Sequence, residues 1–249
     1  MVPRKRHTPL QQEQIQPNMC DLHMRLEILH QVPFFSGLPE DAIADINARF
    51  REKGYAPGET VYFAGDEATR IFVVASGKVK LIRHTPGGQD VVLDILMSGE
   101  FFGSISLLGD DVYRNTVQAQ TLACVLNISA EDFHDILQRY PSVAIAALDI
   151  TAARLKAAFE TIQQLSLHPI EHRIAAVLVK LADKFGEAQP DGLLIQLPLS
   201  RQDLADMTGT TPETASRVMS QFQQTGLIRT GRQWVEVRDY QQLTQISRE

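Results

Sequence analysis

The chain has 249 residues, of which 44% are hydrophobic and 22% charged, which predicts a globular protein of one large or two modest domains. Its two cysteines are too few for a disulfide framework, and no apolar run reaches the roughly 18 residues that span a bilayer, so we expect a cytoplasmic protein with no membrane partner. The net charge of -6 argues against a generally basic nucleic-acid binder, but residues 166–249 carry 9 Lys and Arg against 10 Asp and Glu, which leaves room for one basic face.

Residues 1–20 are polar and rich in Gln and Pro, and they predict a flexible tail. Leucines at helical spacing predict a short helix over residues 21–31, and Pro39 followed by two acidic residues opens another. From Gly54 to Gly109 the chain holds nine of its 15 glycines, between short β-branched runs. Because turns punctuate these runs and no helix separates them, we expect a roll or barrel of about eight strands. The runs are residues 60–63, 71–74, 79–82, 91–93 and 116–128.

Helices are expected again after the roll. Ser129 is a candidate cap for a short helix that begins at Ala130, and Pro141 opens a long helix that runs to about Leu165. The sequence Leu167-His168-Pro169 ends the long helix and predicts a hinge between two domains. Apolar residues recur on it every seven positions, with a second row three residues further on, which predicts a helix paired with its copy in a homodimer. The alternative is a helix packed on its own domain. The first row is Leu148, Leu155 and Ile162, and the second row is Thr151, Ala158 and Leu165.

The C-terminal third begins with a helix that is expected to end near Gly186, before a short strand over residues 193–197. Ser200, with an acidic residue three positions later, is typical of a capping box and predicts a helix to about Met207. After the turn residue Gly209, a Thr-Pro pair predicts the start of a second helix, which runs to about residue 224. Two short helices joined by a tight turn indicate a helix-turn-helix.

The second of these helices has two distinct faces. One face is apolar and is expected to point inward, and the other is polar and lies in the first two turns, the end that enters a major groove. Arg217 can pair with guanine, and Glu213 can accept from the cytosine amino group. The competing interpretation is a solvated polar face. The apolar residues are Ala215, Val218, Met219 and Phe222, and the polar ones are Glu213, Ser216, Arg217 and Ser220.

A hairpin is predicted to follow, with strands at residues 227–229 and 234–237 and a turn at Thr230-Gly231-Arg232. Such a hairpin would be the wing of a winged helix-turn-helix, with Trp234 in the core. Further candidate DNA contacts are Arg201, Thr211, Arg229 and Arg232.

The run from Leu204 to Arg217 and the order of the elements from about residue 30 to 245 resemble the cAMP receptor protein/FNR (Crp/Fnr) family of bacterial transcription regulators. The resemblance implies an α+β protein with an N-terminal double-stranded β-helix, or jelly roll, over residues 21–140. The implied protein continues with a dimerisation helix over 141–167 and a winged helix-turn-helix over 168–249. The resemblance also implies a homodimeric activator that binds double-stranded DNA and works with RNA polymerase. The Glu-x-x-Ser-Arg form of the motif resembles the FNR branch, which implies TTGA-like half-sites in an inverted repeat; in the cAMP-receptor branch, Arg stands where Pro212 stands here.

The resemblance also predicts which residues line an effector pocket. In the family this pocket uses a Gly-Glu pair for the ribose, an Arg-Ser pair for the phosphate and hydroxyl residues on the long helix for adenine. Here Ser104 replaces the carboxylate, Tyr113 stands at the arginine position, and the adenine positions lack hydroxyls, so cAMP is not expected, although Arg114 lies one place away. The corresponding residues are Gly103, Ser104, Ile105, Tyr113, Arg114, Asn115, Ala158 and Phe159.

The resemblance to the Crp/Fnr family also indicates which cofactors to consider. The oxygen-sensing FNR proteins hold an iron–sulfur cluster with four cysteines, and this chain has only Cys20 and Cys124, so no cluster is expected. Members that sense nitric oxide or carbon monoxide hold haem through histidine, and haem stays open here, as do an organic metabolite and control by abundance alone. The candidate ligands, each of which also fits an ordinary surface residue, are His30, His84 and His134, with Met19, Cys20 and His23 near the N-terminus.

Two other classes of function are alternatives to a transcription regulator. A cyclic-nucleotide-binding signalling module without DNA binding would share the roll but would have no use for residues 200–238. An enzyme is not expected, because the sequence has no nucleophile elbow, P-loop, zinc-ligand spacing or dinucleotide fingerprint. Asp90, Asp94 and Glu100 are more typical of surface and turn carboxylates than of a catalytic pair.

Overall fold

The computed structural model describes residues 22–85, 90–104 and 112–248, so the predicted tail and Ile105 lie outside the described residues. The chain forms two compact units that divide between Phe159 and Glu160, within helix α4 (Pro141–Leu167). No helix of the described ranges is long and apolar enough to cross a bilayer.

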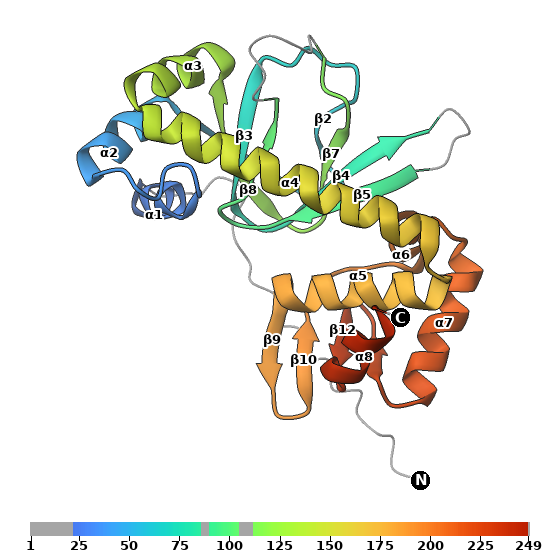
Figure 1. The fold of residues 1–249 in the computed structure, drawn as a ribbon. Coiled ribbons are helices and arrows are strands. Elements are labelled where there is room, and N and C mark those ends of the chain that lie inside the picture. Colours follow the sequence, from blue (N-terminus) through green and yellow to red (C-terminus); the bar gives the residue numbers. More distant parts are fainter. Residues whose placement is uncertain (1–21, 86–89, 105–111, 249) are drawn as a thin grey trace. The chain divides into compact units, whose positions relative to one another are not determined.

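The first unit contains the predicted roll, built from two antiparallel four-stranded sheets (Figure 1). One sheet has the order β1-β8-β3-β6 and the other β2-β7-β4-β5. The single strand expected over 116–128 is two strands that belong to different sheets, because the chain bends at residues 120–122. The strands are β1 (Arg51–Tyr55), β2 (Thr60–Tyr62), β3 (Arg70–Ser76), β4 (Val79–His84), β5 (Asp90–Leu96), β6 (Phe101–Gly103), β7 (Thr116–Ala119) and β8 (Ala123–Ser129).

Strand β3 lies between two hydrophobic clusters and contributes side chains to both. Its side chains alternate between the faces of the sheet, and Ile71 to Ser76 are all buried. Phe72 and Val74 point into the interior between the sheets, whereas Ile71 and Val73 belong to a second cluster formed with the helices. A strand covered on both faces is continuously apolar, and the alternation of a half-exposed strand is absent from it.

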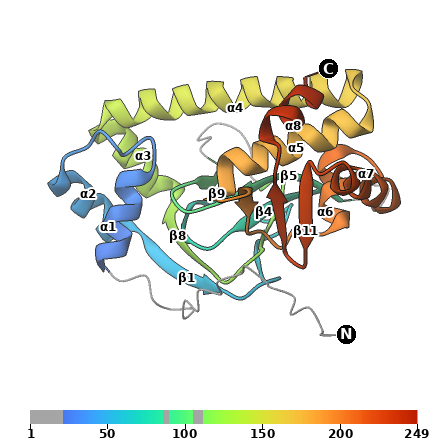
Figure 2. The ribbon, with the colours of Figure 1, turned by 90° about the horizontal axis from the view of Figure 1, so that it is seen from below.

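Three short helices cover the outer face of the β3 sheet: α1 (Leu22–Gln31), α2 (Glu40–Arg49) and α3 (Ala130–Arg139) (Figure 2). The predicted cap of α3 is confirmed, because the Ser129 side chain accepts from the backbone N–H of Asp132.

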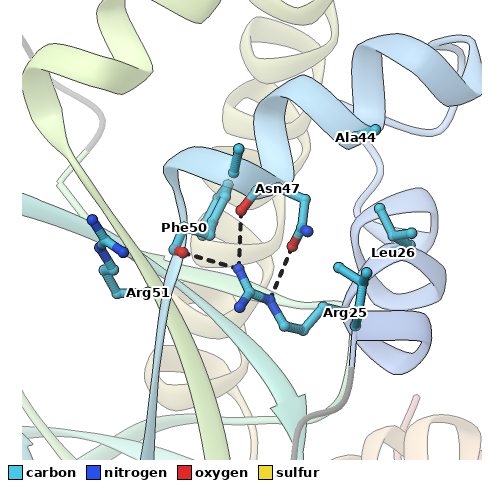
Figure 3. A pocket seen from close by; sticks show the side chains of 8 residues that line it. Arg25, Leu26, Ala44, Asn47, Phe50 and Arg51 are labelled. Carbon is cyan, nitrogen blue, oxygen red and sulfur yellow. Dashed lines mark hydrogen bonds between the residues drawn. The ribbon is translucent and has the colours of Figure 1, made fainter.

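A hollow of about 460 Å³ lies at the junction of α1 and α2 (Figure 3). Beside it, the guanidinium of Arg25 donates to the side chain of Asn47 and to the backbone carbonyls of Asn47 and Phe50. These carbonyls lie at the C-terminal end of α2, where the backbone lacks its full set of intrahelical partners. The Asn47 carbonyl also accepts from the backbone N–H of Phe50, and Arg25 adds further hydrogen bonds at this end. Arg25 also pairs with Glu52 on β1. The hollow is lined by Leu22, Arg25, Leu26, Ala44, Asn47, Ala48, Phe50 and Arg51.

The second unit is a four-stranded antiparallel sheet of order β11-β12-β10-β9 with four helices. Leu178, Phe222 and Val235, from α5, α7 and β12, are buried in its core. Strand β9 and the last helix, α8, were not predicted. The elements are α5 (Ile170–Phe185), β9 (Gly186–Gln189), β10 (Gly192–Ile195), α6 (Arg201–Thr208), α7 (Pro212–Gln224), β11 (Ile228–Gly231), β12 (Trp234–Val237) and α8 (Tyr240–Ile246).

Candidate nucleic-acid interface

Helices α6 and α7 form the predicted helix-turn-helix. The capping box at the start of α6 is complete, since the side chain of Ser200 accepts from the backbone of Asp203 and the Asp203 carboxylate accepts from the backbone of Ser200. Gly209 follows the helix in the left-handed conformation, with φ 62°. Arg173 of α5 closes the end of α6, because its Nη1 donates to the carbonyl of Thr208 at 2.7 Å. Helix α6 is therefore capped at both ends.

Gly209→Ala tests this turn. A side chain at Gly209 would meet its neighbours only at ordinary contact distances, so the cost comes from the left-handed backbone and amounts to about 1–2 kcal/mol of unfolding free energy. Urea unfolding of the variant measures this loss. Gly37→Ala is the matched control, because Gly37 has open space around it, and this variant should leave stability almost unchanged. Equal stabilities of the two variants would show that the turn does not require glycine.

Helix α7 presents the two faces that the sequence predicts. The four apolar residues of its inner face are all buried, while Glu213, Arg217 and Ser220 are exposed and Ser216 is half-buried. Thr211 caps the helix, since its side chain accepts from the backbone N–H of Thr214, and Pro212 occupies the first position. The outer row is thus held on a rigid helix from its first turn.

The chemistry of this outer row is specific. The backbone N–H of Glu213 and the side chain of Thr211 hold the pKa of the exposed Glu213 carboxyl below its usual range, so at neutral pH Glu213 only accepts hydrogen bonds. The guanidinium of Arg217 has no partner among the described residues and is available for a ligand. Ser220 donates its hydroxyl to the carbonyl of Ser216 at 2.8 Å, so Ser220 can only accept from a base or phosphate donor.

Arg201 lies at the first position of α6. It is half-buried, burial lowers the pKa of its guanidinium, and no partner for its side chain is found in the described part of the chain. A desolvated cation without a counter-ion at the positive end of a helix is unfavourable by itself, and an anion at that place would relieve it.

The wing is formed by β11 and β12, with the turn at Arg232 and Gln233, one residue later than predicted. Trp234 is buried as expected, at 7% exposure. Arg232 is exposed at the tip, whereas Arg229 already has intramolecular contacts: its Nη1 lies 3.9 Å from the Glu236 carboxylate, and its guanidinium lies 5.6 Å from the centroid of the Trp234 ring. Arg232 is therefore the freer of the two predicted phosphate contacts.

Comparison with known proteins agrees with this geometry. Residues 172–246 match the family model of the Crp-like helix-turn-helix domain, and residues 52–140 match that of the cyclic nucleotide-binding domain. The cyclic AMP receptor protein of Thermus thermophilus is 33% identical over 215 residues, which are 86% of this chain and 96% of that protein. The chain belongs to the Crp/Fnr family of bacterial transcription regulators.

Two further relatives show how widely the Crp/Fnr arrangement extends. The fumarate and nitrate reduction regulatory protein of Escherichia coli is 24% identical over 248 residues, which are 99% of this chain and 97% of that protein. The solved structure of a CooA mutant from Carboxydothermus hydrogenoformans has a TM-score of 0.69 at 25% identity, covering 82% of this chain and 90% of that one. The chain is a DNA-binding transcription regulator of this family, and its relatives are regulators rather than enzymes.

The residues at the Crp/Fnr effector positions lie in different surroundings. Gly103 has φ +99°, and a side chain there would lie 2.8 Å from the carbonyl oxygen of Arg70, so glycine is required. Ser104 and Asn115 are half-buried, and Arg114 is exposed. The two adenine positions, Ala158 and Phe159, are exposed on α4, the latter at 63%.

Tyr113, which stands at the arginine position, is a core residue. Its ring stacks on Tyr62 at 3.8 Å between centroids, inside an aromatic group that includes Phe72 and Phe102. Its hydroxyl accepts from the backbone N–H of Arg70 and donates to the Arg70 carbonyl. Burial raises the pKa of the Tyr113 hydroxyl, so it keeps the proton that this second bond needs.

Tyr113→Phe distinguishes a core residue from a pocket residue. Removal of the hydroxyl leaves the N–H and carbonyl of Arg70 without this partner, which should cost about 1–3 kcal/mol of unfolding free energy in a urea titration. Tyr140→Phe is the control, because the Tyr140 hydroxyl has no hydrogen-bond partner in the described ranges, and its change should stay within about 0.5 kcal/mol. No loss in Tyr113→Phe would mean that its hydroxyl faces solvent or a ligand.

Helix α4 exposes the predicted apolar row. Leu148 is 69% exposed, and Leu155 and Ile162 are similarly exposed. The predicted second row, Thr151, Ala158 and Leu165, is exposed as well. Two further large apolar side chains, Ile145 and Phe159, are exposed at alternating spacings of three and four beside the first row, with Ala152 between them. We call Ile145, Leu148, Ala152, Leu155, Phe159 and Ile162 the α4 stripe.

The candidate haem ligands are scattered over the described residues. Both ring nitrogens of His84 are engaged, with Asp90 at 2.6 Å and Thr116 at 2.9 Å. His134 contacts Gln138, and His23 pairs with Glu27, one turn further along α1. His30 is half-buried on α1, and Cys124 is buried in β8. Met19 and Cys20 lie outside the described residues, and within those that are described no cluster of three metal-binding side chains is found.

Proposed function

We propose that this regulator binds, as a homodimer, an inverted repeat of TTGA-like half-sites, with α7 of each protomer in a major groove. The supporting observation is the outer row of α7, where an unpartnered Arg217 lies next to the ionised Glu213 at the start of a capped helix. The Glu-x-x-Ser-Arg form of this row favours the FNR-like half-site. Two such helices should lie about 34 Å apart, one turn of DNA.

The α4 stripe is the proposed dimer interface. Its residues follow the alternating three- and four-residue spacing of a coiled-coil seam over about 26 Å of helix. Large apolar side chains gathered on one exposed helix face favour association. From the family alone, we also propose that the DNA-bound dimer acts on RNA polymerase, as an activator.

For the signal, we propose that the roll does not bind a cyclic nucleotide through the contacts that the family uses. The competing effector is a cyclic nucleotide, which the match to the cyclic nucleotide-binding domain favours. Against it stand the stacked Tyr113 at the phosphate position and the loss of the carboxylate at Ser104. Haem fits no better, because the candidate histidines of the described residues do not converge and His84 has no free ring nitrogen.

One set of measurements tests these proposals. Fluorescence anisotropy should show tighter binding to a palindromic TTGA duplex than to a scrambled duplex of equal length, with affinity falling steeply as salt rises. Equal affinity for both duplexes would contradict sequence-specific readout. Calorimetric titration with cAMP should show no heat of binding, and a Soret band in the absorption spectrum of the purified protein would establish haem instead.

A further inference from the structure

The apolar contacts of helix α4 with the roll come from its first turns. Val143 and Ala147 are buried there, and Ile150 packs against the same cluster. From Thr151 to Gln163 the residues are largely exposed to solvent, except that the guanidinium end of Arg154 is partly buried against the roll. Arg154 continues the buried face, one turn beyond Ile150, so its side chain leaves the helix toward the roll.

Arg154 contacts both the backbone and the side chain of Phe101 in the roll. Its Nη2 donates to the carbonyl of Phe101 at 2.7 Å, and its guanidinium lies 3.9 Å from the centroid of the Phe101 ring. Burial lowers the pKa of Arg154, while the carboxylates of Glu100 and Asp94 act in the opposite direction and favour its charge. A planar cation that stacks, donates and has acidic neighbours is a firm link between two elements.

The strand that receives this link has a special place in the roll. Phe101 begins β6, and its ring packs against Phe34, 4.8 Å away between centroids. The next residue, Phe102, stacks on Phe72 in the interior between the two sheets. Gly103 and the predicted effector segment follow directly. A change in the packing of β6 would therefore move the carbonyl and the ring of Phe101, which contact Arg154.

Resting on the proposed function, we infer that Arg154 is a positioning residue that ties α4 to β6 and holds the α4 stripe in the orientation needed for dimerisation and DNA binding. The adenine positions Ala158 and Phe159 offer no hydroxyl by which a ligand in the roll could hold the helix. The guanidinium of Arg154 makes the bridge from within the chain. DNA binding then depends on this internal link and needs no bridging ligand.

The test uses the full chain and three variants. Arg154→Ala removes the link, Arg154→Lys keeps the charge but loses the planar stack, and Arg139→Ala is the matched control, since Arg139 lies at the end of α3 and forms its 2.8 Å ion pair with Asp45 of α2. We measure affinity for the palindromic duplex without added effector, sedimentation, and amide hydrogen exchange over residues 151–163. Thermal unfolding shows whether each variant is folded.

Arg154→Ala should bind the duplex about 5- to 30-fold more weakly, exchange its α4 amides faster and keep the melting temperature of the roll. Arg154→Lys should lie between it and the wild type, and Arg139→Ala should equal the wild type. Wild-type affinity and exchange in both Arg154 variants would overturn the inference. If Arg154→Ala fails to fold, Arg154→Lys decides alone. If the wild-type chain ignores DNA, the proposed function fails, and hydrogen exchange and sedimentation still test the link.

Discussion

Arg217→Ala should abolish the preference for the palindromic duplex over a scrambled one. Arg217 projects from the second turn of α7 with no partner among the described residues, and a bidentate pair with guanine is worth about 1–3 kcal/mol at each half-site. The expected loss is roughly 5- to 150-fold in specific affinity per half-site. Affinity for random DNA should fall much less, because that binding depends on phosphate contacts.

Arg232→Ala is the control variant that separates phosphate contacts from base readout. Arg232 is exposed at the tip of the wing, where it is expected to touch phosphate and no base. Its loss should weaken both duplexes by a similar factor and reduce the salt dependence of binding by about one unit of slope. If both arginine variants behaved alike, base readout could not be assigned to Arg217.

Leu155→Glu should break the dimer. Leu155 lies in the middle of the α4 stripe at 56% exposure, and the proposed dimer would bury it. Two leucines leave water when the helices pair, at about 1.5–3 kcal/mol each, and two carboxylates facing each other replace that gain with repulsion. The dimer should weaken at least about 100-fold, and binding to the palindrome should fall with it.

Ala153→Glu is the control for this change. Ala153 is also exposed on α4 but lies off the stripe, so the same charge there should leave the dimer intact. Sedimentation equilibrium measures both variants. A fully dimeric Leu155→Glu protein would place the interface elsewhere, and dissociation of both variants would point to loss of helix rather than loss of contact.

Local signals explain why much of the DNA-binding region could be predicted from sequence. The caps at Ser200 and Thr211 depend on residues three positions away, and the inner and outer faces of α7 follow from helical geometry. The sequence predicts the wing turn one residue early, because glycine is the usual signal of a turn and Gly231 lies one position before the observed turn. The left-handed position is in fact occupied by Gln233, with φ 67°, a conformation that its residue type does not signal.

The roll was harder to predict, because its strands depend on distant partners. Strand β1 contains three charged residues and, among the described strands, pairs only with β8. At this edge position its side chains do not show the alternation of apolar and polar residues that predicts a strand. Strand β6 has three residues, too few for a periodic signal. The contact between Arg154 and Phe101 joins residues 53 positions apart, and the stack of Tyr113 on Tyr62 joins residues 51 apart. No local rule relates such pairs.

A change of one atom in the DNA tests the central claim most directly. Replacing the guanine of each TTGA half-site with 7-deazaguanine removes the N7 acceptor and keeps the sequence, so only a contact to that base edge is lost. Anisotropy should show wild-type binding weakened by about fivefold or more, with no further loss in Arg217→Ala. Wild-type protein that binds both duplexes equally well would contradict the account.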